Sequence, residues 1–413
     1  MSSRPYHVQS AVDNPDSFPH HQSISALWNL KWQKLATMGV YPFHDGKVED
    51  FEPIFQTLIQ ANGNNSDVLY NPDKYAEPFL PAAETLVAEA KKFESDGSKD
   101  KARELYLRAA TVCRIGRFPI VRSSGGKALW ELNKRAYLGA SPYLSPPNTE
   151  VEIPFAHALA TTGEASSAFI PAYLRVPEGK PPGGGWPVVL FICGLDHYRT
   201  DFEQRAARHA KDGFACVIVE IPGTGDCPAA KDDSTSPGRV WSSVLDWIDS
   251  QSSQYSFNTS RIVARGMSTG GYNAMRIAHT HADRLFAVVA QGGGSHHMFD
   301  PQWIKAQNHM EYPYALADAL AFKFGYDSVD KYAAGASQKF SLLETGIFDK
   351  ESTRLFLING MEDSIFPIED SFLPLRHGRV KDARFLEDRQ HVGNPGGDDI
   401  VYDWLREVVY GQK

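Results

Sequence analysis

Cysteine is scarce in this sequence. The chain of 413 residues contains four cysteines, which are too few and too scattered for a disulfide framework or a paired-cysteine metal site. Cys193 and Cys216 lie inside apolar runs, where a thiol behaves as a small hydrophobic side chain. We therefore expect reduced cysteines, no metal site and no cofactor.

Long apolar runs and an excess of basic residues are also missing. No window approaches the roughly 18 to 20 uninterrupted apolar residues of a membrane span, and residues 1–21 lack the apolar core of a signal peptide. The formal net charge of −8 provides no basic surface for nucleic acid. These absences argue against a transmembrane protein and a nucleic-acid-binding protein, and they predict an intracellular, cytoplasmic location.

The first third of the chain carries a helical pattern. Residues 1–22 are rich in Ser, Pro, His and Asp and predict a flexible arm. Apolar residues then recur at helical spacing to about residue 144, as in the stripe formed by Ala102, Leu105, Ala109 and Val112. The sequence therefore predicts a helical N-terminal domain over residues 23–148.

The pattern changes near residue 151. Two strand-like segments lead into the continuous apolar run 187–193, after which short strand-like and helix-like pieces alternate. Such alternation predicts the α/β class, a mostly parallel sheet with helices on both faces, over residues 149–413. The alternation stops at about 295–350, an aromatic-rich insertion that we interpret as a lid, with a helical hairpin packed on the sheet as the alternative.

The stretch 261–278 carries the strongest chemical signal. A β-branched apolar run enters a Gly-x-Ser-x-Gly turn at Gly266, and a helix of small residues follows at once. The five-residue pattern alone often marks an ordinary turn. Between a strand and a helix it predicts that Ser268 stands on a tight turn with its hydroxyl exposed, ready to act as a nucleophile.

A serine nucleophile needs a base and a carboxylate that orients the base. In this type of fold the acid and then the histidine follow the serine along the chain. Glu362 and Asp363 follow the predicted strand 355–359, at the sheet edge where such sites collect. We take Asp363 as the acid, with Glu362 or a solvated turn as alternatives. His391, the last histidine in the chain, is the predicted base.

An oxyanion hole requires backbone N–H groups that point at the developing negative charge. One predicted donor is the amide of Thr269, directly after the nucleophile. The second is the amide of Leu195, in the turn after the predicted strand 187–193. Asp196, beside this hole, is either a substrate contact or a turn residue.

With these residues in place, the C-terminal two thirds of the chain resembles an α/β-hydrolase. The preceding helical segment, residues 98–119, is similar to a subgroup that includes the bacterial dihydroxypseudooxynicotine hydrolase and the fermentation-respiration switch protein. Over nearly its whole length the sequence most resembles the fungal yellowish-green conidial pigment hydrolases of melanin biosynthesis. This resemblance implies cleavage of the carbon-carbon bond between an aromatic polyketide ring and its acetyl or acetoacetyl side chain, which yields tetrahydroxynaphthalene.

The resemblance also implies a mechanism. Ser268, deprotonated by His391, attacks the side-chain carbonyl and expels a ring carbon. Since a carbon leaving group is harder to expel than an alkoxide, an acid or a constrained geometry is expected to help. Four residues of the insertion are candidate substrate contacts for this role: His296, His297, Glu311 and Tyr312. For the two adjacent histidines, a hydrogen-bonded turn is the alternative.

Two other functions compete with this hypothesis. A carboxylesterase or thioesterase would use the same triad on simple esters. A non-catalytic regulatory binding protein could use the hydrolase scaffold alone, although the complete set of Ser268, Asp363 and His391 argues against it. The predicted partner is a small-molecule aromatic polyketide. The acyl-chain length, a homodimeric state and an association with vesicles are left open.

Overall fold

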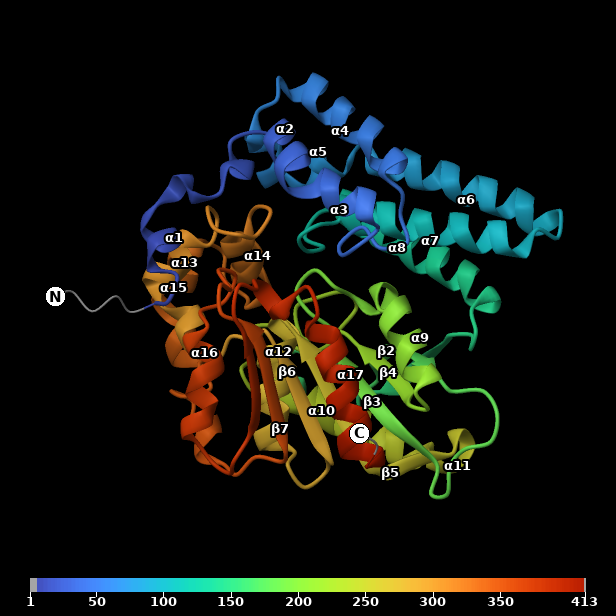
Figure 1. Cartoon of the computed structure of the whole chain (residues 1–413), viewed down its shortest axis with the longest axis vertical. Helices are drawn as coiled ribbons and strands as arrows, with labels where there is room; N and C mark the ends of the chain where they lie inside the picture. Colours follow the sequence, from blue (N-terminus) through green and yellow to red (C-terminus); the bar gives the residue numbers. More distant parts are fainter. Residues whose placement is uncertain (1–5, 412–413) are drawn as a thin grey trace.

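The computed structural model describes residues 6–411 and contains an eight-stranded sheet with helices around it (Figure 1). The strands are β1 (Thr149–Pro154), β2 (Phe169–Arg175), β3 (Trp186–Ile192), β4 (Ala215–Val219), β5 (Phe257–Met267), β6 (Ala287–Gln291), β7 (Leu355–Gly360) and β8 (Asp382–Leu386). Their order across the sheet is β1-β2-β4-β3-β5-β6-β7-β8. Because only β1/β2 and β2/β4 pair antiparallel, the predicted mostly parallel α/β sheet is confirmed.

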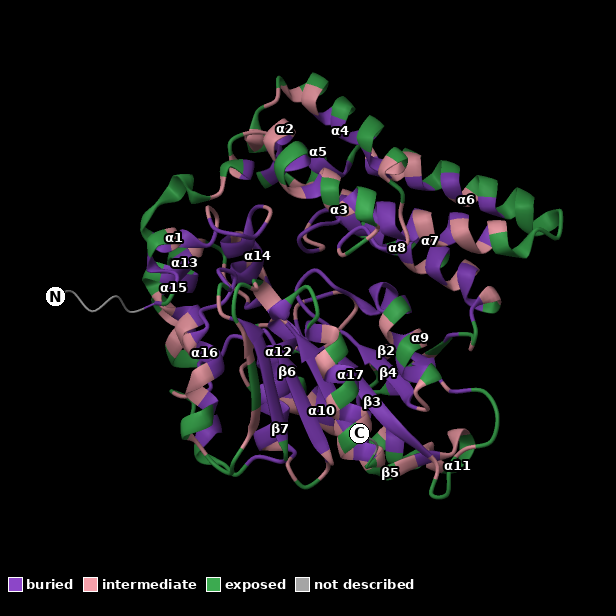
Figure 2. Ribbon diagram, viewed as in Figure 1, coloured by how far each residue is buried: buried purple, intermediate pink, exposed green. Residues whose placement is uncertain are grey.

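The central strands are buried along their whole length. Every residue of β3, β4, β6 and β7 is buried, as the purple arrows of Figure 2 show. This burial explains why these segments read as continuous apolar runs, since a parallel strand covered on both faces has no polar side. Helices cover both faces in Figure 1, with α9 (Glu203–Lys211) and α17 (Gly397–Tyr410) in front and α10 (Ser236–Ser250) and α12 (Thr269–Thr280) behind.

Helices also form the N-terminal region, which lies over one end of the sheet (Figure 1). They are α2 (Ile24–Ala26), α3 (Gln33–Met38), α4 (Val48–Asn62), α5 (Pro72–Ala76), α6 (Phe79–Ser95), α7 (Lys99–Gly116) and α8 (Ser124–Ala140). The predicted stripe on α7 is buried at Ala102, Leu105, Ala109 and Val112. Within residues 6–411, no helix is both long and apolar enough to cross a membrane.

The structure differs from the flexible arm that the sequence predicts at the N-terminus. Residues 1–5 of that segment lie outside the described residues. From Tyr6 onward the chain forms α1 (Gln9–Asp13) and short helical turns, and it packs against the insertion. The Tyr6 ring meets the Trp303 ring edge-on at 5.0 Å, and the Tyr6 hydroxyl donates to Asp300 Oδ2 at 2.9 Å. The composition of this segment is polar, but its few apolar side chains pack on the insertion, and Tyr6 bonds Asp300, which lies 294 residues away in the sequence.

The insertion forms α13 (Pro301–Ala306), α14 (Leu316–Lys323) and α15 (Val329–Phe340). Most of its aromatic side chains pack against one another. The Phe324 ring stacks on Tyr332 at 5.8 Å and meets Phe299 at 5.4 Å. Tyr326 and Phe340 belong to the same cluster of rings. These contacts favour the alternative of a packed hairpin, and the lid over residues 295–350 stays a prediction.

The remaining helices are short and connect the strands at the sheet ends. They are α11 (Ser252–Tyr255), before β5, and α16 (Glu369–Phe372), between β7 and β8.

Candidate active site

A cavity of about 380 Å³ lies where the sheet, the insertion and the N-terminal helices meet. This volume is within the range of small-molecule sites. The predicted nucleophile Ser268 and the predicted base His391 both line it, together with Asp196, Glu311 and Tyr312. The structure thus brings together five of the residues that the sequence singled out.

Ser268 stands in a strained turn between β5 and α12. Its backbone has φ 55° and ψ −126°, which a residue with a side chain rarely adopts. A Cβ at Gly266 would overlap the carbonyl oxygen of Gly270, and a Cβ at Gly270 would lie 2.7 Å from the carbonyl oxygen of Cys193. The turn therefore requires glycine on both sides of Ser268, which is the physical basis of the Gly-x-Ser-x-Gly pattern.

We expect Gly270→Ala to lower the free energy of unfolding by about 3 kcal/mol, because the new methyl group must push the backbone of β3 away. Urea unfolding followed by circular dichroism measures this change. Gly238→Ala is the matched control, since Gly238 lies in α10 with open space around its Cα. That variant is expected to gain about 0.5–1 kcal/mol. Equal stability of the two variants would contradict the tight contact between the turn and β3.

The predicted acid and base are hydrogen-bonded to each other. His391 Nδ1 lies 2.8 Å from Asp363 Oδ2. Asp363 is fully buried, and its Oδ1 accepts hydrogen bonds from the backbone N–H groups of Ile365 and Phe366. Asn359 Nδ2 donates to Oδ2 at 2.8 Å. These bonds hold the carboxylate in one orientation and leave His391 Nε2 without a hydrogen-bond partner among the described residues.

The environment of His391 favours proton uptake. Burial by itself would lower the pKa of His391, but the charge and hydrogen bond of Asp363 outweigh burial and raise that pKa above its usual value. The carboxyl groups of Glu311 and Asp196 act in the same direction. A half-buried imidazole with a raised pKa and a free Nε2 is suited to take a proton from a nearby hydroxyl.

Glu362, the alternative acid, points away from His391. Its side chain is exposed, and its Oε1 lies 3.1 Å from His7 Nε2 on the N-terminal segment. Position in the sequence could not separate two neighbouring acids at the end of β7. The structure separates them because adjacent side chains leave the backbone in different directions.

The two predicted oxyanion donors are both free. In the part of the chain that the structure describes, neither the N–H of Leu195 nor that of Thr269 donates to a backbone or side-chain acceptor. Thr269 is the first residue of α12, where an N–H has no partner within the helix. The turn that carries Leu195 is closed by a hydrogen bond from Gly194 N–H to the carbonyl of His197 at 3.0 Å.

Asp196 forms a phenol-carboxylate pair in the cavity wall. The Tyr312 hydroxyl donates to Asp196 Oδ2 at 2.8 Å. Burial raises the pKa of Asp196, while the hydroxyl groups of Tyr312 and Tyr41 oppose this shift. Asp196 lines the cavity, and a role as a substrate contact stays a prediction.

Glu311 is a buried carboxyl group near the predicted triad. Its Oε2 accepts from the Ser364 hydroxyl at 3.3 Å. Burial and the nearby charge of Asp363 raise the pKa of Glu311, against the opposing charge of Lys31. Lys31 comes from a π-helical turn over Leu27–Trp32, a local irregularity that is frequent at functional sites.

His296 and His297 do not line the cavity. Their backbone N–H groups donate to Asp370 Oδ1 at 2.8 Å and 2.7 Å. The His296 ring bonds the Ser341 hydroxyl, and the His297 ring lies 3.0 Å from Asp300 Oδ2. The predicted substrate contact for this pair is therefore corrected to a hydrogen-bonded turn, which was the alternative.

Several cavity residues were missed by the analysis of the sequence. The N-terminal helical region supplies Leu30, Lys31, Trp32, Leu35, Tyr41, Pro42 and Phe118. The Phe118 ring stacks on Tyr312 at 5.2 Å, which joins the helical region to the insertion above the cavity. Phe118 lies in residues 98–119, the segment that resembles a known hydrolase subgroup. That resemblance was the one sequence feature that could have drawn attention to Phe118 as a site residue.

The protein-family model for FrsA-like esterases, described as "Esterase FrsA-like", matches residues 80–385. The chain is 25% identical to Esterase FrsA of Escherichia coli (strain K12) over 301 residues, which cover 71% of this chain and 66% of that protein. It is 26% identical to Esterase FrsA of Escherichia fergusonii over 277 residues, 65% of this chain and 61% of that protein. The matches thus span slightly less than two thirds of the relatives' own length.

Two solved structures share the fold. The 2,6-dihydroxy-pseudo-oxynicotine hydrolase has a TM-score of 0.67 and 19% sequence identity, covering 82% of this chain and 90% of its own. AbyA5 has a TM-score of 0.60 and 19% identity, covering 79% of this chain and 88% of its own. At this identity the similarity shows the α/β-hydrolase fold with its helical N-terminal region, as the sequence predicted.

Proposed function

This chain belongs to the FrsA-like esterase family, and from that premise we propose that it is a serine hydrolase that shortens an aromatic polyketide. The reaction is cleavage of the carbon-carbon bond between the aromatic ring and an acetyl or acetoacetyl side chain. The product is tetrahydroxynaphthalene, a precursor of melanin or conidial pigment. The observation that carries the hydrolase assignment is the Asp363–His391 hydrogen bond of 2.8 Å, with His391 lining the same cavity as the strained Ser268.

The first half-reaction uses the proposed triad Ser268, His391 and Asp363. Ser268 Oγ attacks the side-chain carbonyl carbon while His391 Nε2 takes the hydroxyl proton. The amides of Leu195 and Thr269 stabilise the resulting oxyanion. When the tetrahedral intermediate collapses, the bond to the ring breaks and its electron pair moves to the ring carbon. The acyl group remains on Ser268 as an ester.

Protonation of the ring carbon completes the cleavage. Protonated His391 gives the Ser268 proton to the ring carbon, either directly or by reprotonating Glu311 after Glu311 has donated its own proton. The raised pKa of each group favours its protonated form, and either route leaves His391 neutral. Asp196 and Tyr312 are suited to bind phenolic hydroxyl groups, which spread the negative charge of the ring. Water, activated by His391, then attacks the acyl ester and releases acetate or acetoacetate.

Hydrolysis of a carboxylic ester or thioester is the second candidate function. It is supported by the printed name of the curated relatives, Esterase FrsA. An ester releases an alkoxide or thiolate that needs no carbon protonation, so this function makes no use of a second acid such as Glu311. The two functions therefore differ in what they require of Glu311.

We expect the purified protein to convert acetyl- or acetoacetyl-tetrahydroxynaphthalene into tetrahydroxynaphthalene, measured by liquid chromatography and mass spectrometry. Glu311→Gln is expected to slow this conversion by about 10²-fold or more, the usual size of general acid catalysis. The same variant should hydrolyse p-nitrophenyl acetate within a few-fold of the wild-type rate. Ester hydrolysis without any shortened naphthol would reject carbon-carbon cleavage in favour of the esterase.

A further inference from the structure

Two arginines of the N-terminal helical region enclose one aspartate of the sheet domain. Arg114 lies near the end of α7 and Arg117 directly follows it, and both side chains are buried. Arg114 Nε lies 3.0 Å from Asp201 Oδ1, and Arg117 Nη2 donates to Asp201 Oδ2 at 2.6 Å. Burial would raise the pKa of Asp201, but the two guanidinium charges outweigh it and hold that pKa well below its usual value. Asp201 is thus a fully buried, ionised carboxylate.

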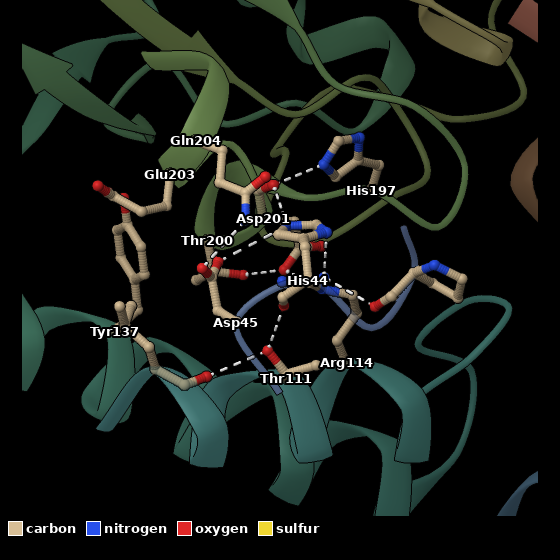
Figure 3. A network of polar contacts seen from close by, with 12 residues as sticks. His44, Asp45, Thr111, Arg114, Tyr137, His197, Thr200, Asp201, Glu203 and Gln204 are labelled. Carbon is tan, nitrogen blue, oxygen red and sulfur yellow. Dashed lines mark hydrogen bonds and ion pairs between the residues drawn. The ribbon is translucent and has the colours of Figure 1, made fainter. Parts of the chain in front are cut away.

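The cluster extends through histidines that close it to solvent. Arg114 Nη1 donates to His44 Nδ1 at 2.9 Å, and His44 Nε2 donates to the carbonyl of Asp201 at 3.0 Å (Figure 3). His197 Nε2 donates to the same carbonyl at 2.7 Å. Burial lowers the pKa of both histidines, so they serve as neutral donors. Figure 3 shows these side chains converging on Asp201 between α7 and the sheet domain.

Arg117 also holds the turn that carries the proposed oxyanion donor. Its Nη1 donates to the backbone carbonyl of Asp196 at 3.1 Å, one residue after Leu195. Its guanidinium lies over the Tyr198 ring at 3.9 Å, and the Tyr198 N–H donates to Asp201 Oδ2 at 2.8 Å. Residues 196, 198 and 201 of one short loop are therefore fixed by a single arginine-aspartate pair.

We propose that Arg117, held by Asp201, is a positioning residue that keeps the Leu195 N–H directed at the reacting carbonyl oxygen. This inference rests on the serine hydrolase mechanism proposed above. If Arg117 served only to hold the helical region against the sheet, its bond to the Asp196 carbonyl would not be needed. The buried ion pair by itself gives little net stability over apolar packing. An oxyanion hole, by contrast, depends on donors held to a fraction of an ångström. In this proposal the helical region does more than line the cavity, because its Arg117 also fixes the position of the Leu195 N–H.

The test compares Arg117→Lys with Arg175→Lys. Lysine at position 117 keeps the charge near Asp201, but a single ammonium group cannot reproduce the planar contacts to Asp201 and Asp196 together. Arg175 is also a buried arginine between the two regions. It pairs with Glu203 at 2.8 Å, two residues after Asp201, and Glu203 accepts from the Tyr137 hydroxyl of α8. Within the described residues, no hydrogen bond joins Arg175 to residues 194–198. Arg175→Lys is therefore a matched structural control.

Binding of a trifluoromethyl ketone, which forms a reversible tetrahedral adduct with a serine hydroxyl, is the decisive measurement. We expect Arg117→Lys to weaken this ligand and to lower kcat by about 10- to 100-fold. KM and the affinity for the corresponding methyl ketone should stay within about threefold. In Arg175→Lys, we expect kcat, KM and the affinities for both ketones to stay within about threefold of the wild-type values, even if the melting temperature falls. Unchanged kcat and trifluoromethyl ketone affinity in Arg117→Lys, or an equal loss in Arg175→Lys, would overturn the proposal.

Two further variants keep the outcome unambiguous. If Arg117→Lys does not fold, Asn133→Ala decides, since it removes the bond from Arg117 Nε to Asn133 Oδ1 at 3.2 Å, together with the longer bond from the Thr200 hydroxyl to the same oxygen at 3.3 Å. We expect it to weaken trifluoromethyl ketone binding about threefold, and an unchanged affinity would reject the proposal. Ser268→Ala is measured alongside. Full turnover by Ser268→Ala would reject the serine hydrolase itself, whereas loss there with normal Arg117→Lys rejects only the positioning role.

Discussion

Ser268→Ala is expected to lower kcat by about 10⁴- to 10⁶-fold while the protein stays folded. The methyl group cannot form the acyl ester, so only the residual effect of binding and oxyanion stabilisation remains. Ser268 lines the cavity, and replacing it by alanine removes one oxygen without adding volume. Turnover of the naphthol substrate or of p-nitrophenyl acetate measures the loss, and the melting temperature checks the fold.

A fluorophosphonate, which phosphonylates activated serines, provides an independent measurement. Mass spectrometry should find one label on Ser268 in the wild type and none in Ser268→Ala. Ser253→Ala, in the exposed part of α11, is the control and should keep both turnover and labelling. Substantial turnover by Ser268→Ala would show that another group carries the reaction.

Asp363→Asn is expected to lower kcat by about 10⁴-fold. Asp363 Oδ2 accepts both from Asn359 and from the His391 ring, so an amide nitrogen in its place would face a donor. The imidazole would then turn or change tautomer, and its Nε2 would no longer accept the Ser268 proton. Glu362→Gln is the matched control on the neighbouring acid, which is exposed and pairs with His7. It should keep normal kcat, and a larger loss there would reverse the assignment of the acid.

The pH dependence of kcat/KM provides a second readout of this carboxylate. His391 acts as a base only when it is neutral, so activity is present above its pKa and is lost as the pH falls through it. Because Asp363 raises that pKa, the acidic limb of the wild-type profile is expected above pH 6.5, the ordinary value for histidine. Removing the charge in Asp363→Asn should move the limb to lower pH. A limb that stays in place in this variant would contradict the pairing.

Local patterns predicted the sheet and the nucleophile turn well. The buried strands stand out because a strand covered on both faces must be apolar along its length, as in Val188–Ile192. The glycines at 266 and 270 stand out because no side chain fits beside the neighbouring backbone. The apolar runs and the contact between Gly266 and Gly270 are local, whereas Gly270 is required because β3 passes beside it. All three requirements appear in the sequence as short patterns.

The choice between neighbouring residues needed the structure. Asp363 and Glu362 have the same chemistry and adjacent positions, yet only Asp363 faces His391. His296 and His297 follow β6, where a site residue was expected, but Asp370 captures their backbone N–H groups. No short-range rule predicts these outcomes, because each depends on a partner tens of residues away.

Taken by itself, the sequence determined the α/β class and the tight turn at Ser268, and it predicted an acid and a base in the order Asp363, His391. These features appear in the sequence as apolar runs and as the spacing of glycines. Only the tertiary structure decided what surrounds the reacting serine: Phe118 against Tyr312, Lys31 near Glu311, and Arg117 on Asp201. Those contacts join residues about 80 to 280 positions apart, and they exist only because the helical region and the insertion fold over the same end of the sheet.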